Sequence, residues 1–305
     1  MFRRSIVDDV RELARRRNAL ILAHFYQSLE IQELAHFVGD SLKLSLDAMN
    51  AKGDMIVFCG VYFMAEQAAV LNPDVPVYIP DKDAICRLAD MLSVEDIVAA
   101  KKKHPDAIVV MYVNSKAIHK AYADYIVTSA NAVKVIEEIP NDTIIFGPDR
   151  NLAEFVAERT GKNIIPVPEN GHCYVHVMFN TSDISKFREK GFSVTVHPEC
   201  PRAVRSMADF IGSTKQMYDY IRNSAAKKIV VGTEVGFIDR VKCDFPDKTI
   251  EPLKPDAICE DMKKITLEKL YMSLRDKKYR VIVERDIAKR IRNALNKTFQ
   301  LLGII

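Results

Sequence analysis

The sequence predicts an α/β protein made of three homologous repeats. Two observations predict this fold class: short Val- and Ile-rich runs alternate with segments of helical periodicity, and the same landmarks return about every 86 residues. Strands separated by helices form parallel sheets with right-handed crossovers. We therefore expect three α/β/α repeats with parallel sheets, arranged around a pseudo-threefold axis.

The repeat is clearest at three cysteines that follow proline-containing segments. Cys86 and Cys259 each end the tetrapeptide DAIC, and Cys173 ends the segment PENGHC, so the separations are 87 and 86 residues. Four identical residues 173 positions apart are therefore a repeat signature.

Three more landmarks recur in the same order within each repeat. An apolar run ends 61 or 62 residues before each cysteine, at His24, Tyr112 and His197. A hydroxyl residue lies 17 positions after each of these, at Ser41, Ser129 and Thr214. A glycine follows after 18 or 19 more, at Gly60, Gly147 and Gly232. Four landmarks at nearly fixed spacing exclude chance.

The elements follow from the apolar runs. The N-terminal segment MFRRSIVDDVRELARRR carries charges where a signal peptide needs an apolar stretch, so it is predicted to form an amphipathic helix. In the first repeat, strands are expected near residues 19–24, 36–39, 54–60 and 75–80, with helices between them. The last segment is predicted to add a helix, a strand and a helix that pack on the first repeat. The predicted boundaries are 1–86, 87–173, 174–259 and 260–305.

Composition limits the classes of function. The chain has 44 basic and 41 acidic residues, and a net charge of +3 does not favour a nucleic-acid-binding surface. We find no apolar run of membrane-spanning length, no G-x-G-x-x-G and no Walker motif. Without an export signal, we expect a cytoplasmic protein whose six cysteines serve as ligands or catalysts more readily than as disulfides.

The three repeated cysteines predict a metal centre. If the repeats surround an axis, Cys86, Cys173 and Cys259 converge on it. Three thiolates are too few for structural zinc, but they suit a [4Fe–4S] cluster with one open iron, which acts as a Lewis acid. The alternative is three structural cysteines. Of the others, Cys59 is expected in the core, while Cys243 and Cys200 are left without a ligand role.

Other polar candidates follow the strand ends, where ligands of parallel sheets gather. Ser41, Ser129 and Thr214 stand where helices begin, so they either bind anions or serve only as helix N-caps. These strand ends offer His24 with Tyr26, Tyr112 with Asn114, and His197 with Glu199. His197 and Glu199, close together on one loop, are plausible general acid–base groups, with a solvated turn as the alternative. His172 and His176 flank Cys173 and could orient a cluster. The expected surface histidines are His36, His104 and His119.

With these residues in place, the chain resembles the quinolinate synthase family of iron–sulfur enzymes from residue 17 onward. The motifs that carry the resemblance are LAHFYQ, FVGDS, YVNS, TSANA, FGPDRNL, PENGHC, VHPEC, ADFIGST and GTEVG. One departure is CEDMKK, which lacks the additional cysteines that many bacterial relatives carry beside the third ligand, so a disulfide switch there is not expected.

The resemblance implies a fold, a reaction and residue roles. The fold is three α/β units around a pseudo-threefold axis. The reaction is condensation of iminoaspartate with dihydroxyacetone phosphate to quinolinate, phosphate and water, in NAD biosynthesis. The implied partner enzyme is an L-aspartate oxidase or aspartate dehydrogenase that supplies iminoaspartate.

The implied residue roles fall into four groups. The cluster ligands are Cys86, Cys173 and Cys259. The groups that hold anionic parts of the substrates are Ser129 and Thr214, with Ser41 and His24 nearby. The groups that bind the intermediate are Tyr112 and Asn114. The groups that transfer protons are Tyr26, His197 and Glu199.

Two other functions remain open on the residues alone. A different iron–sulfur dehydratase acting on a hydroxy acid would need only the open iron and a base. A cluster-based sensor would need a regulatory or DNA-binding element, and the chain shows neither a basic helix nor an extra domain.

Overall fold

Three sheets organise residues 5–50 and 52–304, which are the residues that the computed structural model describes. The first repeat supplies β1 (Ala19–His24), β2 (Phe37–Gly39), β3 (Met55–Cys59) and β4 (Val77–Tyr78). The second supplies β5 (Ile108–Tyr112), β6 (Tyr125–Val127), β7 (Thr143–Gly147) and β8 (Asn163–Pro166). The third supplies β9 (Ser193–Val196), β10 (Phe210–Ile211), β11 (Lys228–Gly232) and β12 (Thr249–Pro252). The four strands expected in the first repeat are confirmed to within two residues at each end.

All three sheets have the same topology. Their strand orders are β2-β1-β3-β4, β6-β5-β7-β8 and β10-β9-β11-β12, and every one of these pairings is parallel. In each sheet the chain goes from the first strand to one side and then returns to the other. The predicted α/β fold class with parallel sheets is confirmed.

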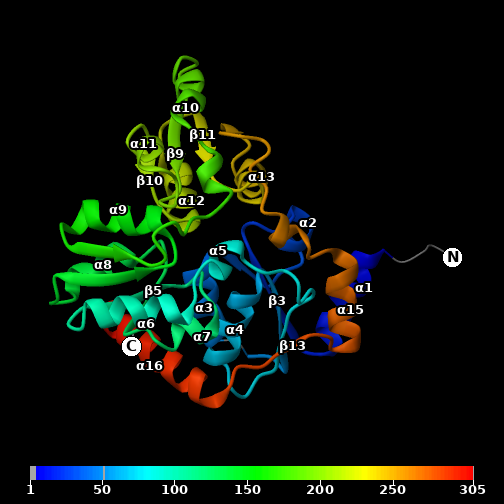
Figure 1. Cartoon of the computed structure of the whole chain (residues 1–305). Helices are drawn as coiled ribbons and strands as arrows, with labels where there is room; N and C mark the ends of the chain where they lie inside the picture. Colours follow the sequence, from blue (N-terminus) through cyan, green and yellow to red (C-terminus); the bar gives the residue numbers. More distant parts are fainter. Residues whose placement is uncertain (1–4, 51, 305) are drawn as a thin grey trace. The chain divides into compact units, whose positions relative to one another are not determined.

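Helices cover these sheets in pairs. On the first sheet α1 (Ile6–Arg16) packs with α15 (Leu267–Asp276), and α3 (Ser41–Met49) packs with α4 (Tyr62–Leu71). The pairs of the second repeat are α6 (Val94–Lys103) with α7 (Ala117–Lys120) and α8 (Ala132–Glu138) with α9 (Arg150–Thr160). Those of the third are α10 (Thr181–Arg188) with α11 (Arg202–Arg205) and α12 (Thr214–Asn223) with α13 (Val235–Asp244), as Figure 1 shows.

Burial explains the apolar runs. Every residue of β3 is buried, as expected for a parallel strand with helices on its sheet.

The predicted N-terminal helix is confirmed over Ile6–Arg16. Ser5 caps it, Asp8 and Asp9 lie in its first turn, and Arg15 and Arg16 lie in its last turn. Residues 1–4 of the expected helix lie outside the described residues.

The C-terminal segment divides between two compact units. Unit 1 comprises residues 1–86 and 259–285, and unit 2 comprises residues 87–258 and 286–305. In unit 1, β13 (Arg280–Val281) pairs antiparallel with β4. In unit 2, Thr298 of α16 (Arg285–Leu301) accepts a hydrogen bond from the Ile126 N–H of β6 at 3.2 Å.

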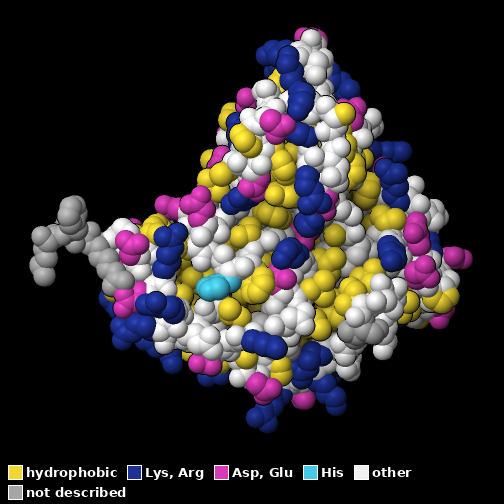
Figure 2. Space-filling view, turned by 180° about the vertical axis from the view of Figure 1, so that it is seen from behind, with side chains coloured by type: hydrophobic (Ala, Val, Ile, Leu, Met, Phe, Trp, Pro, Cys, Tyr) yellow, Lys and Arg dark blue, Asp and Glu magenta, His cyan; other side chains and the backbone are white. Residues whose placement is uncertain are grey.

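Surface charge agrees with the small net charge. Basic and acidic side chains are interspersed over the face shown in Figure 2. Among the described residues, no helix is both long and apolar enough to cross a bilayer.

Candidate active site

The shared topology places one end of each sheet where ligands bind. In a parallel sheet whose strand order reverses between the first and third strands, the crevice lies outside their carboxyl ends. His24, Tyr112 and His197 stand at or directly after the ends of the first strands, and Gly60, Gly147 and Gly232 at or directly after the ends of the third strands. The polar residues near these ends are therefore the candidates for chemistry.

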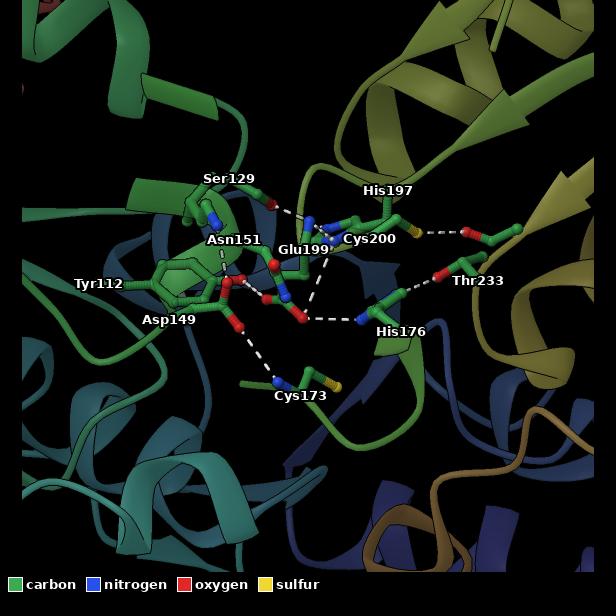
Figure 3. A network of polar contacts seen from close by, with 12 residues as sticks. Tyr112, Ser129, Asp149, Asn151, Cys173, His176, His197, Glu199, Cys200 and Thr233 are labelled. Atoms are coloured by element: carbon green, nitrogen blue, oxygen red, sulfur yellow. Dashed lines mark hydrogen bonds and ion pairs between the residues drawn. The ribbon is translucent and has the colours of Figure 1, made fainter. Parts of the chain in front are cut away.

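Glu199 is the centre of a buried polar network in unit 2 (Figure 3). It lies on the loop after β9 and is 2% exposed. The Tyr112 hydroxyl donates to Glu199 Oε1 at 2.5 Å, and His176 Nδ1 lies 2.7 Å from Glu199 Oε2. The loop after β9, the end of β5 and the helical turn His176–Met178 thus converge on one carboxylate.

Two imidazoles extend the network. The rings of His176 and His197 stack with their centroids 4.5 Å apart and an angle of 18° between their planes. His176 Nε2 is 3.0 Å from the hydroxyl of Thr233, which follows β11. The Glu199 N–H donates to His197 Nδ1 at 3.3 Å, so His197 Nε2 carries the ring proton and faces Ser129 Oγ at 3.1 Å.

The network lowers the pKa of one buried carboxyl group and raises the pKa of another. Burial alone would raise the pKa of Glu199, but the neighbouring His197 and His176, with hydrogen bonds from His176 and Tyr112, outweigh it and lower the pKa to about 2. Burial, and next the charge of Glu199, raise the pKa of Asp149. Asp149 is fully buried and accepts hydrogen bonds from the Leu152 and Cys173 N–H groups at 2.7 and 3.1 Å.

Ser129 connects the network to open space. A pocket of 420 Å³ in unit 2 is lined by Ser129, Pro198, Phe210, Gly212 and Gln216, among others. Because Ser129 Oγ also faces His197 Nε2, a ligand in this pocket can reach a hydroxyl that is coupled to the imidazole.

Asn114 offers an unsatisfied acceptor two residues after Tyr112. Its side-chain oxygen is buried and has no hydrogen-bond partner in the described part of the chain. Buried polar atoms normally find partners, so an oxygen left in this state beside a site is suited to a ligand donor.

Unit 1 repeats part of this arrangement with different residues. The Tyr26 N–H donates to His24 Nδ1 at 3.2 Å, as Glu199 does to His197, and the rings of His24 and Tyr26 meet edge to face at 4.5 Å. Lys263 Nζ donates to the Tyr26 carbonyl at 2.5 Å. Because Lys263 ends α14 (Glu260–Lys263), the loop after β1 is fixed to the helix that Cys259 begins.

The alternative role expected for Ser41, Ser129 and Thr214, as helix N-caps, is wrong, because the N-cap position is one or two residues away in each case. Ser41 and Thr214 are the first helical residues of α3 and α12, while Asp40 and Ser213 provide the caps. Ser129 precedes Asn131, the N-cap position of α8, by two residues. Sequence spacing locates a helix start, but a neighbouring Asp or Ser competes equally well for the cap.

The three repeated cysteines end loops with the same backbone hydrogen bonds. The residue two positions before each cysteine makes two of these bonds. Its carbonyl accepts the N–H of the first residue of the helix after the third strand, and its N–H donates to the carbonyl three residues earlier. The first set is Tyr62 N to Ala84 O, Arg150 N to Gly171 O and Val235 N to Ala257 O; the second is Ala84 N to Asp81 O, Gly171 N to Pro168 O and Ala257 N to Lys254 O. DAIC and NGHC thus share one pattern of backbone hydrogen bonds although their side chains differ.

A close approach explains the glycine in the second copy. A Cβ on Gly171 would lie 1.8 Å from the Pro148 carbonyl oxygen, far inside van der Waals contact. The alanines of the other copies are therefore excluded at this position.

Two of these cysteines belong to unit 1 and one to unit 2. Within unit 1, Lys264 Nζ donates to the Asp83 carbonyl at 2.8 Å, and Lys269 Nζ donates to Asp81 Oδ2 at 2.5 Å. These lysines fix the segment after Cys259 to the loop before Cys86. Cys173 lies in unit 2.

Burial distinguishes the six cysteines. Cys86, Cys173 and Cys259 are partly exposed. Cys59 and Cys200 are fully buried, and burial raises the pKa of both thiols, for Cys200 with a further contribution from Glu199. A thiol that is held protonated is a poor metal ligand.

Cys173, His176 and Glu199 could also hold a metal ion. Each offers one ligand atom, and these atoms all lie within 4.8 Å of one another.

Sequence reasoning missed Asp149 and Thr233 as site residues. Both follow the glycine landmark of a third strand, Asp149 after Gly147 and Thr233 after Gly232. The available signal was a polar residue within two positions after that landmark. One histidine was also misplaced: His119 is 4% exposed, whereas His36 and His104 are exposed as expected.

Comparison with known proteins agrees with these landmarks. The family described as "Quinolinate synthetase A protein" matches residues 8–300. The chain is 49% identical to the quinolinate synthase of Pyrococcus abyssi over 299 residues, 97% of this chain and 99% of that one. It is 49% identical to that of Methanothermobacter thermautotrophicus, over 96% of this chain and 97% of that one. It is 45% identical to that of Thermotoga maritima, over 98% of this chain and all of that one.

Proposed function

The chain belongs to the quinolinate synthetase A family of enzymes, whose relatives act in NAD biosynthesis, and we propose that it condenses iminoaspartate with dihydroxyacetone phosphate to quinolinate, phosphate and water. The observation that carries the proposal is the network around Glu199. It combines an ionised carboxylate, two imidazoles and a phenol at the end of a parallel sheet, beside a pocket. Those are the groups that proton removal next to a carbonyl and two dehydrations require.

The cofactor that this reaction implies is a [4Fe–4S] cluster on Cys86, Cys173 and Cys259. The residues fit it: Cys86, Cys173 and Cys259 are partly exposed and are carried by equivalent loops, whereas Cys59 and Cys200 are fully buried. When bound, a cluster with one open iron supplies a Lewis acid for the removal of a hydroxyl group.

The chain's own residues would hold the substrates. Ser129 and Thr214, with Ser41 and His24 nearby, would bind the phosphate and carboxylate groups. The first turns of α3 and α12 support this role, since their caps are other residues and helix N-termini favour anions. Phosphate can therefore leave without a basic surface patch.

Other residues would orient the intermediate and move protons. Tyr112 and Asn114 would contact the intermediate, and the unsatisfied Asn114 oxygen supports such a contact. Glu199 would accept and return protons, since its carboxylate lies within reach of Tyr112 and His176. His197 would pass a proton through Nε2 to or from Ser129, and Tyr26, on the loop after β1, would be the third group that transfers protons.

An anaerobic assay tests the proposed reaction. The cluster-loaded enzyme receives iminoaspartate, generated in place by an aspartate oxidase or dehydrogenase, together with dihydroxyacetone phosphate. We expect quinolinate and inorganic phosphate in equal amounts, and no product when dihydroxyacetone replaces its phosphate. Dehydration of a hydroxy acid without a phosphorylated cosubstrate would instead identify the alternative dehydratase.

A further inference from the structure

Cys173, His176 and Glu199 form a group of ligands that does not need the other two repeated cysteines. All three residues lie in unit 2, on the loop that ends at Cys173, the helical turn after it and the loop after β9. Their ligand atoms lie within 4.8 Å of one another. A thiolate, an imidazole and a carboxylate are the donor types that zinc binds.

The spacing of the donors is close to what one ion requires. Zinc binds such donors at about 2.0–2.3 Å in a tetrahedron, which places ligand atoms about 3.3–3.7 Å apart. His176 Nδ1 and Glu199 Oε2 are now 2.7 Å apart, the distance of two atoms that share a proton. A separation of about 0.6–1.0 Å more between these two atoms lets an ion replace that proton.

Each donor already has an outer partner that would fix it for an ion. Thr233 Oγ1 lies 3.0 Å from His176 Nε2, so it can accept that N–H when Nδ1 binds metal. Tyr112 holds the other oxygen of Glu199, and Asp149 holds the Cys173 N–H. Such partners of the ligands are the usual support of a metal site.

We propose that the cluster-free chain binds one zinc-type divalent ion through Cys173, His176 and Glu199, and that this ion excludes the cluster because both need Cys173. Three protein ligands leave a fourth position for water. Entry is from the Cys173 side, since Cys173 is partly exposed whereas His176 and Glu199 are 1% and 2% exposed. Because the same ion binds the Glu199 carboxylate, it also prevents Glu199 from accepting a proton.

Titration of the cluster-free full-length chain with Co²⁺ tests the site, because cobalt substitutes for zinc and a thiolate ligand gives a near-ultraviolet charge-transfer band. We expect one Co²⁺ per chain with that band, displaced by Zn²⁺. In Cys173→Ser the band should disappear. In His176→Gln and Glu199→Gln the affinity should fall at least 100-fold. Circular dichroism checks that each variant is folded.

Two control groups make the result decisive. Cys86→Ser and Cys259→Ser should bind Co²⁺ as the unmodified chain does; loss of binding in either would overturn the proposal in favour of a site made of the three repeated cysteines. Thr233→Val lies outside the ligand set and should weaken binding 10–100-fold, with the same spectrum at saturation. Unchanged affinity in both His176→Gln and Glu199→Gln would equally overturn it.

The order of addition tests the exclusion of the cluster. Zn²⁺ present before reconstitution with iron and sulfide should reduce the iron incorporated, whereas Zn²⁺ added afterwards should leave the iron content unchanged. Equal iron content in both orders would contradict the competition. None of these measurements depends on quinolinate formation, so the metal site and the proposed reaction fail or succeed separately.

Discussion

Glu199 has a proton donor within reach of each carboxylate oxygen, and this determines what its amide would do. In Glu199→Gln the side-chain oxygen can still accept from Tyr112. The new NH₂ group would face His176 Nδ1. His176 Nδ1 can accept a hydrogen bond from it when the ring proton is on Nε2, where that N–H donates to the Thr233 hydroxyl. The amide therefore fits the network without a buried unpaired group.

We predict that Glu199→Gln keeps its cluster and binds substrate but loses turnover by about 10²–10⁴-fold, the usual contribution of a general acid–base group. Quinolinate formation under anaerobic conditions measures the loss. Glu251→Gln, the same change at a partly exposed residue of β12, is the control and should retain full turnover. Near-normal turnover in Glu199→Gln would assign the proton to Tyr26 or His197.

His119 is a buried histidine whose surroundings oppose its charged form, whereas those of Glu199 favour its charged form. It lies on α7, is 4% exposed, and its Nδ1 has no hydrogen-bond partner in the described part of the chain. Burial, and next the charge of Lys116, lower its pKa from 6.5 to about 4, against an opposite effect of Asp90. The folded chain therefore resists a proton that the unfolded chain binds below pH 6.5.

We predict that acid destabilises the protein through His119. Since the folded-state pKa is lowered, the unfolded state binds more protons between pH 6.5 and 4, and stability falls as the pH falls through this range. The loss should approach about 3 kcal/mol at pH 4. Urea unfolding of His119→Gln should lack this component, and the exposed His104→Gln should keep it. Parallel pH profiles for both variants would contradict the assignment.

Residue types at repeat positions could be predicted from the sequence, but their contacts could not. The spacing identified Tyr112, Ser129, His197 and Glu199 as neighbours of strand ends, and the structure brings these four together. The burial of His119 could not be predicted, because a four-residue helix carries too little periodicity to show which side faces the core.

At the scale of elements, helix starts decide which hydroxyl groups are available to a ligand. Ser213 and Gln216 form a capping box at the start of α12, and Thr214 is the first helical residue. Adjacent hydroxyls on one loop therefore have different tasks, one in the helix and one proposed for the substrate.

We predict that alanine separates these two tasks. Ser213→Ala removes the cap and should lower the free energy of unfolding by about 1 kcal/mol. Thr214→Ala leaves the cap intact and should weaken binding of the substrates by about 1.5–3 kcal/mol, the cost of a hydrogen bond to a charged group. Thermal unfolding and Michaelis constants measure the two effects. An unchanged Michaelis constant for both substrates in Thr214→Ala would leave that residue without a binding role.

Strands were easier to predict from the sequence than the residues after them. A buried parallel strand is an uninterrupted apolar run, which is why residues 54–60 predicted β3 so closely. Asp149 lies two residues after Gly147 and Thr233 one residue after Gly232, whereas the first repeat has Val61 and Tyr62 after Gly60. Because the repeats differ chemically at these positions, the repeat itself could not reveal them.

At the scale of the whole molecule, three copies of one loop carry three cysteines. The loops share their backbone hydrogen bonds although their sequences, DAIC and NGHC, differ. The other three cysteines have no such equivalence: Cys59 ends β3, Cys200 is buried with its thiol donating to the Gly232 carbonyl, and Cys243 is exposed on α13.

We predict that this equivalence divides six cysteine variants into two groups. Cys86→Ser, Cys173→Ser and Cys259→Ser should each fail to assemble a normal cluster, because an iron that loses its thiolate has no equivalent partner in the loop. Cys59→Ala, Cys200→Ala and Cys243→Ser should retain it; alanine is used at the two fully buried positions so that no unpaired hydroxyl is introduced. Iron and sulfide analysis after anaerobic reconstitution, with the visible spectrum, measures assembly. Full iron in the Cys173 variant would remove the proposed cluster site, while loss of iron in Cys200→Ala would add a ligand that lies outside the repeat.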